Sequence, residues 1–157
     1  LDKLETEYSL VRKRHPMWAK PNRQGVKYYI DDCFLNFWFR FIESNRPLVE
    51  LGKLEMLEET IRNEYTQYSG LVLEKYFRQQ YGEKERVTEV SHWWDSQGEN
   101  EIDLIALERL DKRATLAEVK RNPKKYDPKV LAERYEYIKK HLKGYDVNLI
   151  GLSMNDM

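Results

Sequence analysis

The spacing of apolar residues changes near residue 86, and this change limits the possible folds more than any other feature. Upstream of it, apolar side chains recur every three or four residues, which predicts two helices, Leu48–Glu64 and Tyr65–Tyr81. Downstream, short runs rich in β-branched and aromatic residues predict three strands, Val87–Trp94, Ile102–Leu107 and Ala114–Val119. The chain therefore combines a helical first half with a second half built on a sheet.

A further helix and strand complete the second half. Pro128 suits the first turn of a helix, which we expect to run through Leu142 and to end at Gly144. Val147–Leu152 then predicts a fully buried strand. Because the helix links two strands, it can act as a crossover between parallel neighbours. We therefore predict an α/β (α+β) fold in which a mixed central sheet is flanked by helices.

The first 30 residues suggest part of another module. Helical spacing from Leu1 to Val11 is followed by a basic strand-like run that ends before Pro16, by a loop at Pro21–Gly25, and by a strand at Val26–Ile30. Helix, strand, basic loop and strand form the second half of a winged helix. Since the chain begins in what reads as mid-helix, we expect it to be a fragment of a longer protein.

The pattern divides the chain in two. We expect residues 1–47 to be the C-terminal part of a winged-helix module with its connecting helix, and residues 48–157 to be the second domain. Asp31 or Asp32 can cap that connecting helix, and apolar residues from Phe34 to Ile42 predict a face that is mostly core, with Trp38 inside it. Gly70 lies within a predicted helix, where it costs about 1 kcal/mol relative to Ala, so we expect a close packing contact there.

Composition narrows the setting of the protein. The 27 basic residues balance the 27 acidic ones, so net charge gives no support for nucleic-acid binding. Cys33 is the single cysteine, which excludes an intramolecular disulfide and fits a reducing compartment, with the cytoplasm as the default. The most apolar run, Phe34–Ile42, is much shorter than the roughly 20 residues needed to span a bilayer.

Charged residues interrupt the apolar strands of the second half. Asp103 lies inside the run Ile102–Leu107, and Glu118 and Lys120 bracket Val119 at the end of the next strand. Glu118 and Lys120 are two residues apart, so both side chains leave the same face of the sheet, and the hairpin brings that face beside Asp103. Unpaired charges in such positions are costly, which favours a functional site over chance.

Two neighbouring carboxylates in an apolar setting repel each other, and a hard divalent cation relieves that repulsion. We therefore predict that Asp103 and Glu118 bind Mg²⁺ or Mn²⁺. Lys120 can then orient or deprotonate a water molecule that attacks a phosphodiester. Glu74, on the helix before the sheet, is a fourth candidate, although a glutamate on a helix is more often simply exposed.

The order of these residues resembles the PD-(D/E)XK nuclease superfamily. A Glu on a helix, an Asp on a strand and Glu-X-Lys on the next strand match its pattern, although Ile102 replaces the proline before the Asp. The resemblance implies a restriction-endonuclease-like fold in which Glu74, Asp103, Glu118 and Lys120 are the catalytic residues.

A second resemblance covers nearly the whole chain. The segments Tyr29–Asp32, Phe34–Phe41, Gly70–Glu74, Trp93–Trp94, Asn100–Ile105 and Glu118–Lys120 together look like the C-terminal part of archaeal-type AAA+ ATPases. The resemblance implies a partner ATPase module in the same polypeptide, followed by a winged helix and a nuclease-like domain. The chain contains no Gly-x-x-x-x-Gly-Lys-Ser/Thr loop, so we expect no ATP site within it.

Possible contacts with DNA lie around these motifs. Arg23, at the expected wing tip, either contacts phosphate or is a solvated loop residue. One of Trp93 and Trp94 is expected to face away from the core, and we take Trp94 as a base-stacking candidate. The basic stretch after the Glu-X-Lys strand supplies Arg121, Lys124 and Lys125 as phosphate contacts.

Two functions remain open from sequence. The first is a Mg²⁺-dependent DNA endonuclease. The second is a catalytically silent nucleic-acid-binding or protein-docking module that regulates the parent ATPase. A role as an oligomerisation cap has no positive support in the sequence.

Overall fold

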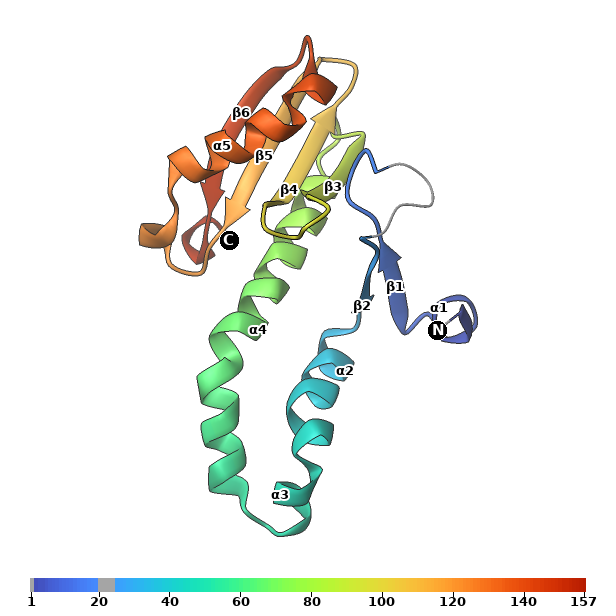
Figure 1. The fold of residues 1–157 in the computed structure, drawn as a ribbon, viewed down its shortest axis with the longest axis vertical. Coiled ribbons are helices and arrows are strands. Elements are labelled where there is room, and N and C mark those ends of the chain that lie inside the picture. Colours follow the sequence, from blue (N-terminus) through green and yellow to red (C-terminus); the bar gives the residue numbers. More distant parts are fainter. Residues whose placement is uncertain (1, 20–24) are drawn as a thin grey trace. The chain divides into compact units, whose positions relative to one another are not determined.

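A computed structural model describes residues 2–19 and 25–157 of the chain (Figure 1). These residues form two compact units. The first contains the described residues up to Arg14 together with Val26–Val72. The second contains His15–Ala19, Gly25 and Leu73–Met157. The break between the two units therefore falls within a helix, beyond the boundary expected after residue 47.

The first unit opens with a short helix and a hairpin. Helix α1 spans Asp2–Thr6, and strands β1 (Val11–Arg14) and β2 (Lys27–Ile30) pair antiparallel. The predicted helix up to Val11 is thus too long, because Ser9 adopts a left-handed conformation (φ 52°) and Val11 already pairs in β1. The hairpin expected for a wing is present, while its tip, including Arg23, lies outside the described residues.

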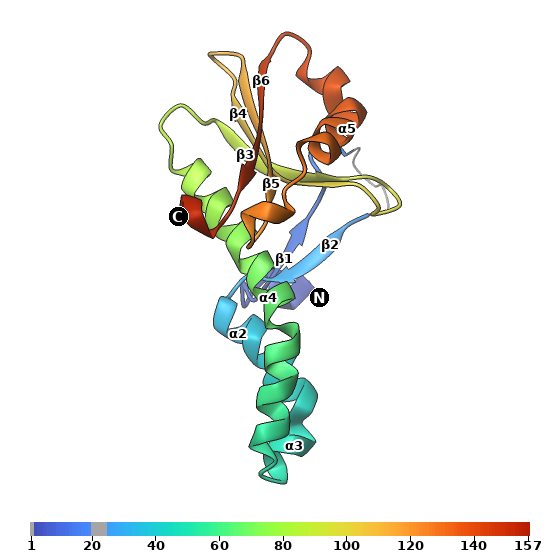
Figure 2. The ribbon, with the colours of Figure 1, turned by 90° about the vertical axis from the view of Figure 1, so that its left-hand side faces the viewer.

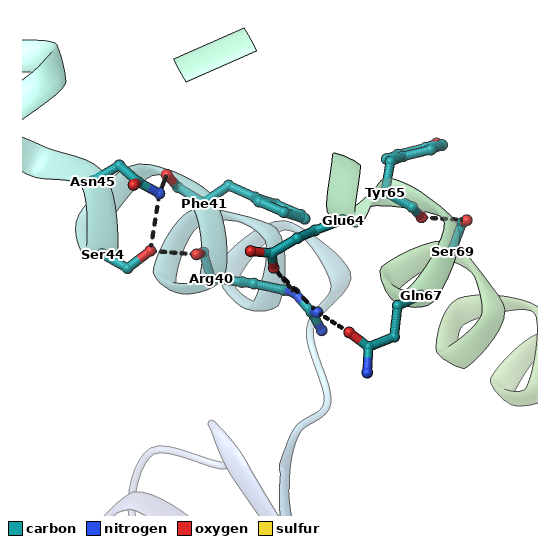
Figure 3. Close-up of polar contacts among 8 residues, drawn as sticks. All are labelled: Arg40, Phe41, Ser44, Asn45, Glu64, Tyr65, Gln67 and Ser69. Atoms are coloured by element: carbon teal, nitrogen blue, oxygen red, sulfur yellow. Dashed lines mark hydrogen bonds and ion pairs between the residues drawn. The ribbon is translucent and has the colours of Figure 1, made fainter. Parts of the chain in front are cut away.

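Helices complete the first unit. They are α2 (Cys33–Phe37), a π-helical turn (Trp38–Ile42), a 3₁₀ turn (Glu43–Asn45), α3 (Arg46–Glu50) and, up to Val72, α4 (Leu54–Gly82). Asp32 caps α2 as expected by accepting a hydrogen bond from the Leu35 amide (2.8 Å). Arg40 joins the π-helical turn to α4 through an ion pair with Glu64 (3.3 Å) and a hydrogen bond to Gln67 (2.6 Å) (Figure 3).

The packing of this unit corrects three predictions. The two helices expected between Leu48 and Tyr81 are mainly one, α4, and a Cβ added at Gly70 would meet nothing within 4 Å, so no close contact explains that glycine. Trp38 is also not core, since 42% of it is exposed. The buried residue of its segment is Phe41, whose ring packs edge-on against Tyr68 of α4.

The second unit is built on a four-stranded sheet in the order β3-β4-β5-β6. Its strands are β3 (Glu89–Trp94), β4 (Glu101–Glu108), β5 (Arg113–Val119) and β6 (Asp146–Leu152). Strand β4 is antiparallel to both β3 and β5, whereas β6 is parallel to β5. Helix α5 (Pro128–Ile138) lies in the connection between β5 and β6. The predicted mixed sheet with a helical crossover is therefore confirmed.

Helices cover both faces of this sheet, which confirms the predicted α/β class (Figure 2). On one face, Leu131 and Ile138 of α5 pack against Ile105 and Leu116. On the other, Leu73 and Phe77, in the part of α4 that belongs to this unit, pack against a second cluster. That cluster contains Leu104, Ala106, Ala117, Val119 and Leu152.

The end of the chain departs from prediction in two ways. Helix α5 ends at Ile138, and a 3₁₀ turn, Lys139–Leu142, replaces its predicted last turn before Gly144 (φ 83°). Strand β6 is not fully buried, because it lies at the edge of the sheet: Asp146 and Asn148 are exposed, and Leu152 is its one buried residue. No helix in the described part of the chain is both long and apolar enough to span a membrane.

One loop is organised by a single carboxylate. Between β3 and β4, Asp95 accepts hydrogen bonds from the backbone amides of Gln97, Gly98, Glu99 and Asn100 and from the Asn100 side chain. The bond from the Asn100 side chain is the main cause of a lowered pKa for Asp95. The loop thus holds the start of β4, which carries Asp103, in register with β3.

We expect Asp95→Ala to lower the free energy of unfolding by about 1 kcal/mol, because the loop amides lose their acceptor but regain water. Asp95→Asn should lose less, since its side-chain oxygen still accepts some of these bonds. Urea denaturation of the three proteins measures the difference. Equal stability of Asp95→Ala and wild type would contradict this role for Asp95.

Candidate functional site

A bulge in β4 sets the position of Asp103. Ser91 pairs with Ile105 and Trp93 pairs with Ile102, so β4 has one residue more than β3 over this interval. Such an insertion bends the strand and frees a residue from the ladder. Asp103 uses this freedom, because its Oδ2 accepts a hydrogen bond from the backbone amide of Val119 on β5 (2.7 Å). Its carboxylate thereby lies at the end of β5.

Glu118 makes two ion pairs. It is 6% exposed, on β5. Its Oε1 lies 2.6 Å from Nζ of Lys120, and its Oε2 contacts Nη1 of Arg134 on α5. The structure therefore brings Glu118 and Lys120 to one face of the sheet, as their spacing predicts.

Glu74 reaches the same place from α4. Its Oε2 lies 3.4 Å from Nη1 of Arg78, one helical turn later. The same Nη1 donates a hydrogen bond to the backbone carbonyl of Asp103 (2.8 Å). Arg78 thus ties Glu74 to the strand that carries Asp103, so all four residues predicted for the site lie in one group.

The charges of this group act on one another. Burial, together with the negative charges of Glu74 and Glu118, raises the pKa of Asp103 to about 8. Burial also raises the pKa of Glu74, against the opposing effect of Arg78. Burial alone would lower the pKa of Lys120, but its hydrogen bond to Glu118 and the charges of Glu118 and Asp103 raise it. Excess negative potential therefore remains at Asp103, and Lys120 is held as a cation.

Sequence reasoning missed three residues of the site. Arg78 and Arg134 lie on helices, where a charged residue usually belongs to a solvated face. The third is Tyr126, whose ring packs over Gly151, the residue of β6 that is paired with Glu118. The signal for Arg78 was its spacing four residues after Glu74. The signal for Arg134 was its place between Leu131 and Ile138 on the buried face of α5. With these arginines, three carboxylates face three cations.

The donor set fits a hard divalent cation of the Mg²⁺ type. Within residues 2–19 and 25–157, no group of three or more His, Cys, Asp or Glu side chains is arranged to hold a metal ion. Mg²⁺, however, is commonly held by one or two carboxylates and keeps several water molecules. Asp103 offers Oδ1 beside the Oδ2 that accepts the Val119 amide, and Glu118 offers two oxygens that are paired with Lys120 and Arg134.

The residues predicted to contact nucleic acid differ in exposure. Trp94 is 4% exposed and its Nε1 donates a hydrogen bond to the Gly25 carbonyl (3.0 Å), so its ring has almost no surface on which a base could stack. That prediction is wrong for this conformation. Lys124 and Lys125 are exposed in a 3₁₀ turn (Pro123–Lys125) shortly after Lys120, and Arg121, the residue after Lys120, is half-buried.

The raised pKa of Asp103 predicts how stability depends on pH. The folded value of about 8 lies above the ordinary value of 3.8, so the stabilisation from this carboxyl is complete below pH about 4 and is lost as pH rises through 8. Without divalent cations, we expect the free energy of unfolding to fall from pH 5 to pH 8, by at most about 1.4 kcal/mol per pH unit for this group.

Asp103→Asn, which is neutral throughout, should give a flatter profile. Asp111→Asn, an exposed change in the β4–β5 hairpin, should keep the slope of the wild type. Urea denaturation in EDTA at four pH values measures all three proteins. Parallel profiles for wild type and Asp103→Asn would show that Asp103 is ionised in the folded protein.

Residues 38–145 match the model of a family described as archaeal and bacterial proteins of unknown function, DUF234. An uncharacterised protein of Methanocaldococcus jannaschii is 34% identical over 121 residues, which are 73% of this chain and 27% of that protein. The chain therefore spans about a quarter of this relative.

No solved structure matches the chain. The match to the family model covers more than half of the chain and includes Glu74, Asp103, Glu118, Lys120 and Arg134. The chain belongs to the DUF234 family of archaeal and bacterial proteins.

Proposed function

We propose that the second unit hydrolyses phosphodiester bonds in DNA with the help of Mg²⁺ or Mn²⁺. The observation that supports this most is the meeting of two buried carboxylates, Asp103 and Glu118, at the ends of neighbouring strands beside Lys120. Buried carboxylates of this kind require a cation, and the pKa of Asp103 near 8 indicates that the protein's own cations leave its charge incompletely balanced.

In this proposal Asp103 and Glu118 hold the cation. When bound, the cation polarises the phosphoryl oxygen and makes a coordinated water molecule more acidic. The raised pKa of Lys120 favours one of its two predicted roles. A charged ammonium group donates hydrogen bonds, so Lys120 orients the attacking water or a phosphate oxygen and does not remove a proton. Glu74 supports the site from α4 through Arg78.

DNA is the proposed substrate because basic side chains continue from the site. Arg121, Lys124 and Lys125 lie within five residues after Lys120 in the chain, and the two lysines are exposed. Such side chains bind the phosphate backbone without regard to sequence. We further propose that this unit belongs to a longer ATPase whose nucleotide site lies in another segment, since the resemblance described above implies such a module and the relative is much longer than this chain.

The proposal is tested by incubating the full chain with supercoiled plasmid and with branched DNA. We expect nicking or cleavage with Mg²⁺ or Mn²⁺ and none with EDTA. DNA that stays intact with both metals, at protein concentrations that saturate binding, would contradict hydrolysis.

A second function is favoured by the cations that the protein itself places in the site. Arg78, Lys120 and Arg134 already face the three carboxylates, as in a purely structural network. We propose as the alternative a catalytically silent module that binds nucleic acid or docks a protein for the parent ATPase. In that case DNA binding survives Asp103→Ala, and calorimetry detects no binding of Mn²⁺ to the wild type.

A further inference from the structure

Arg134 is held over the sheet by the core of the second unit. On the same face of α5, Leu131 precedes it by three residues and Ile138 follows it by four, and both are essentially buried (0% and 1% exposed). The backbone of Arg134 therefore has a fixed position. Its side chain is 18% exposed, so the guanidinium group lies where the buried carboxylates meet solvent.

Glu118 is shared by two cations that are held differently. Lys120 contacts Oε1 from a position just after β5, where the backbone keeps it two residues from Glu118. Arg134 contacts Oε2 through Nη1, and Glu118 is its partner in the structure. Arg134 and Lys120 also repel each other. A divalent cation that binds Glu118 would therefore displace Arg134 at lower cost than Lys120.

We propose that Arg134 exchanges partners: its guanidinium neutralises Glu118 in the metal-free protein, and it binds a phosphate of the DNA backbone when a divalent cation takes its place on Glu118. This inference rests on the proposed function, because it assigns the residue that positions the same substrate. Arginine suits both partners, since its planar fork matches carboxylate and phosphate groups equally well.

Arg134 thereby acts as a positioning residue. Its long side chain can turn while the core keeps its backbone in place, so the guanidinium group stays close to the bound cation. A phosphate oxygen that approaches the site would then meet Arg134 from α5 and Lys120 from just after β5. Replacing Arg134 should therefore have effects of opposite sign on the affinity for the divalent cation and on the affinity for DNA.

The test measures two affinities for the full chain and for Arg134→Met, which removes the charge and keeps the apolar stem. Titration calorimetry with Mn²⁺ should show binding that is about 10–100-fold tighter in the variant, the size of effect that neighbouring residues have on metal sites. Binding of duplex DNA in Ca²⁺ should become weaker. The plot of log binding constant against log salt concentration should have a slope reduced by about one, which corresponds to the loss of one phosphate contact.

Two controls accompany these measurements. Lys140→Met removes an exposed positive charge from the 3₁₀ turn after α5 and should change neither the Mn²⁺ affinity nor the salt slope by a comparable amount. Arg134→Lys keeps the charge but not the fork, so its DNA affinity should lie between those of wild type and Arg134→Met. It also provides a readout if Arg134→Met does not fold.

The outcomes separate this inference from the proposed hydrolysis. Mn²⁺ affinity that is unchanged or lower in Arg134→Met overturns the inference, as does an unchanged DNA affinity in Ca²⁺ or the absence of Mn²⁺ binding in both proteins. Hydrolysis by the wild type could still stand in the first two cases. Conversely, both predicted binding changes without any cleavage of DNA would support the exchange and contradict hydrolysis.

Discussion

Asp103→Asn is expected to fold like the wild type and to cleave DNA at least about 100-fold more slowly with Mg²⁺, the size of effect seen when one preorganised electrostatic contact to a transition state is lost. The amide of Asn still offers an oxygen to the backbone amide of Val119, so the end of β5 keeps its hydrogen bond. What is lost is the negative charge that would hold the cation. Initial rates of plasmid nicking measure the effect.

The matched control is Asp111→Asn, the same chemical change in the β4–β5 hairpin, which should keep the wild-type rate. Lys120→Ala should lose activity as well, because it removes the ammonium group that lies beside Glu118. Equal rates for wild type, Asp103→Asn and Lys120→Ala would mean that any cleavage comes from elsewhere.

Glu118→Gln is expected to lower the free energy of unfolding by about 3 kcal/mol. Breaking a buried ion pair on one side costs about 3–5 kcal/mol, and the lower end applies because Lys120 is 38% exposed and is screened by solvent. The substitution keeps the size of the side chain but leaves Arg134 without its counter-ion. Urea denaturation at pH 7 without divalent cations measures the loss.

A double variant separates charge from packing. Glu118→Gln with Arg134→Gln removes both charges, so it should be more stable than Glu118→Gln alone. If the losses of the two single variants simply add, the ion pair between Glu118 and Arg134 contributes nothing. That result would also remove the basis for a partner exchange by Arg134.

The sheet could be read from the sequence because each of its central strands is a separate apolar run. The same runs exposed the site, since Asp103 and Glu118 interrupt positions that are otherwise buried, and their strands are joined by a hairpin. The bulge that turns Asp103 toward Val119 could not be read, because it depends on how β4 pairs with β3. Strand β6 was wrongly expected to be buried, since an apolar run does not distinguish an edge from a centre.

Helices were harder to interpret. The predicted break between Glu64 and Tyr65 does not exist, because α4 passes through both residues. Trp38 was assigned to the core from helical spacing, but a π-helical turn changes which side chains face α4 and leaves Phe41 buried instead. Arg134 escaped notice for a related reason, because a charged residue on a helix reveals a partner only once the sheet beneath it is known.

The most direct test of the central claim, that Asp103 and Glu118 bind a divalent cation, is a crystal structure of the full chain grown with Mn²⁺ and measured at the manganese absorption edge. We predict an anomalous peak for a manganese ion that is coordinated by Oδ1 of Asp103 and by an oxygen of Glu118, with Arg134 turned away from Glu118. An ordered site without such a peak, in which Arg134 still contacts Glu118, would contradict the claim.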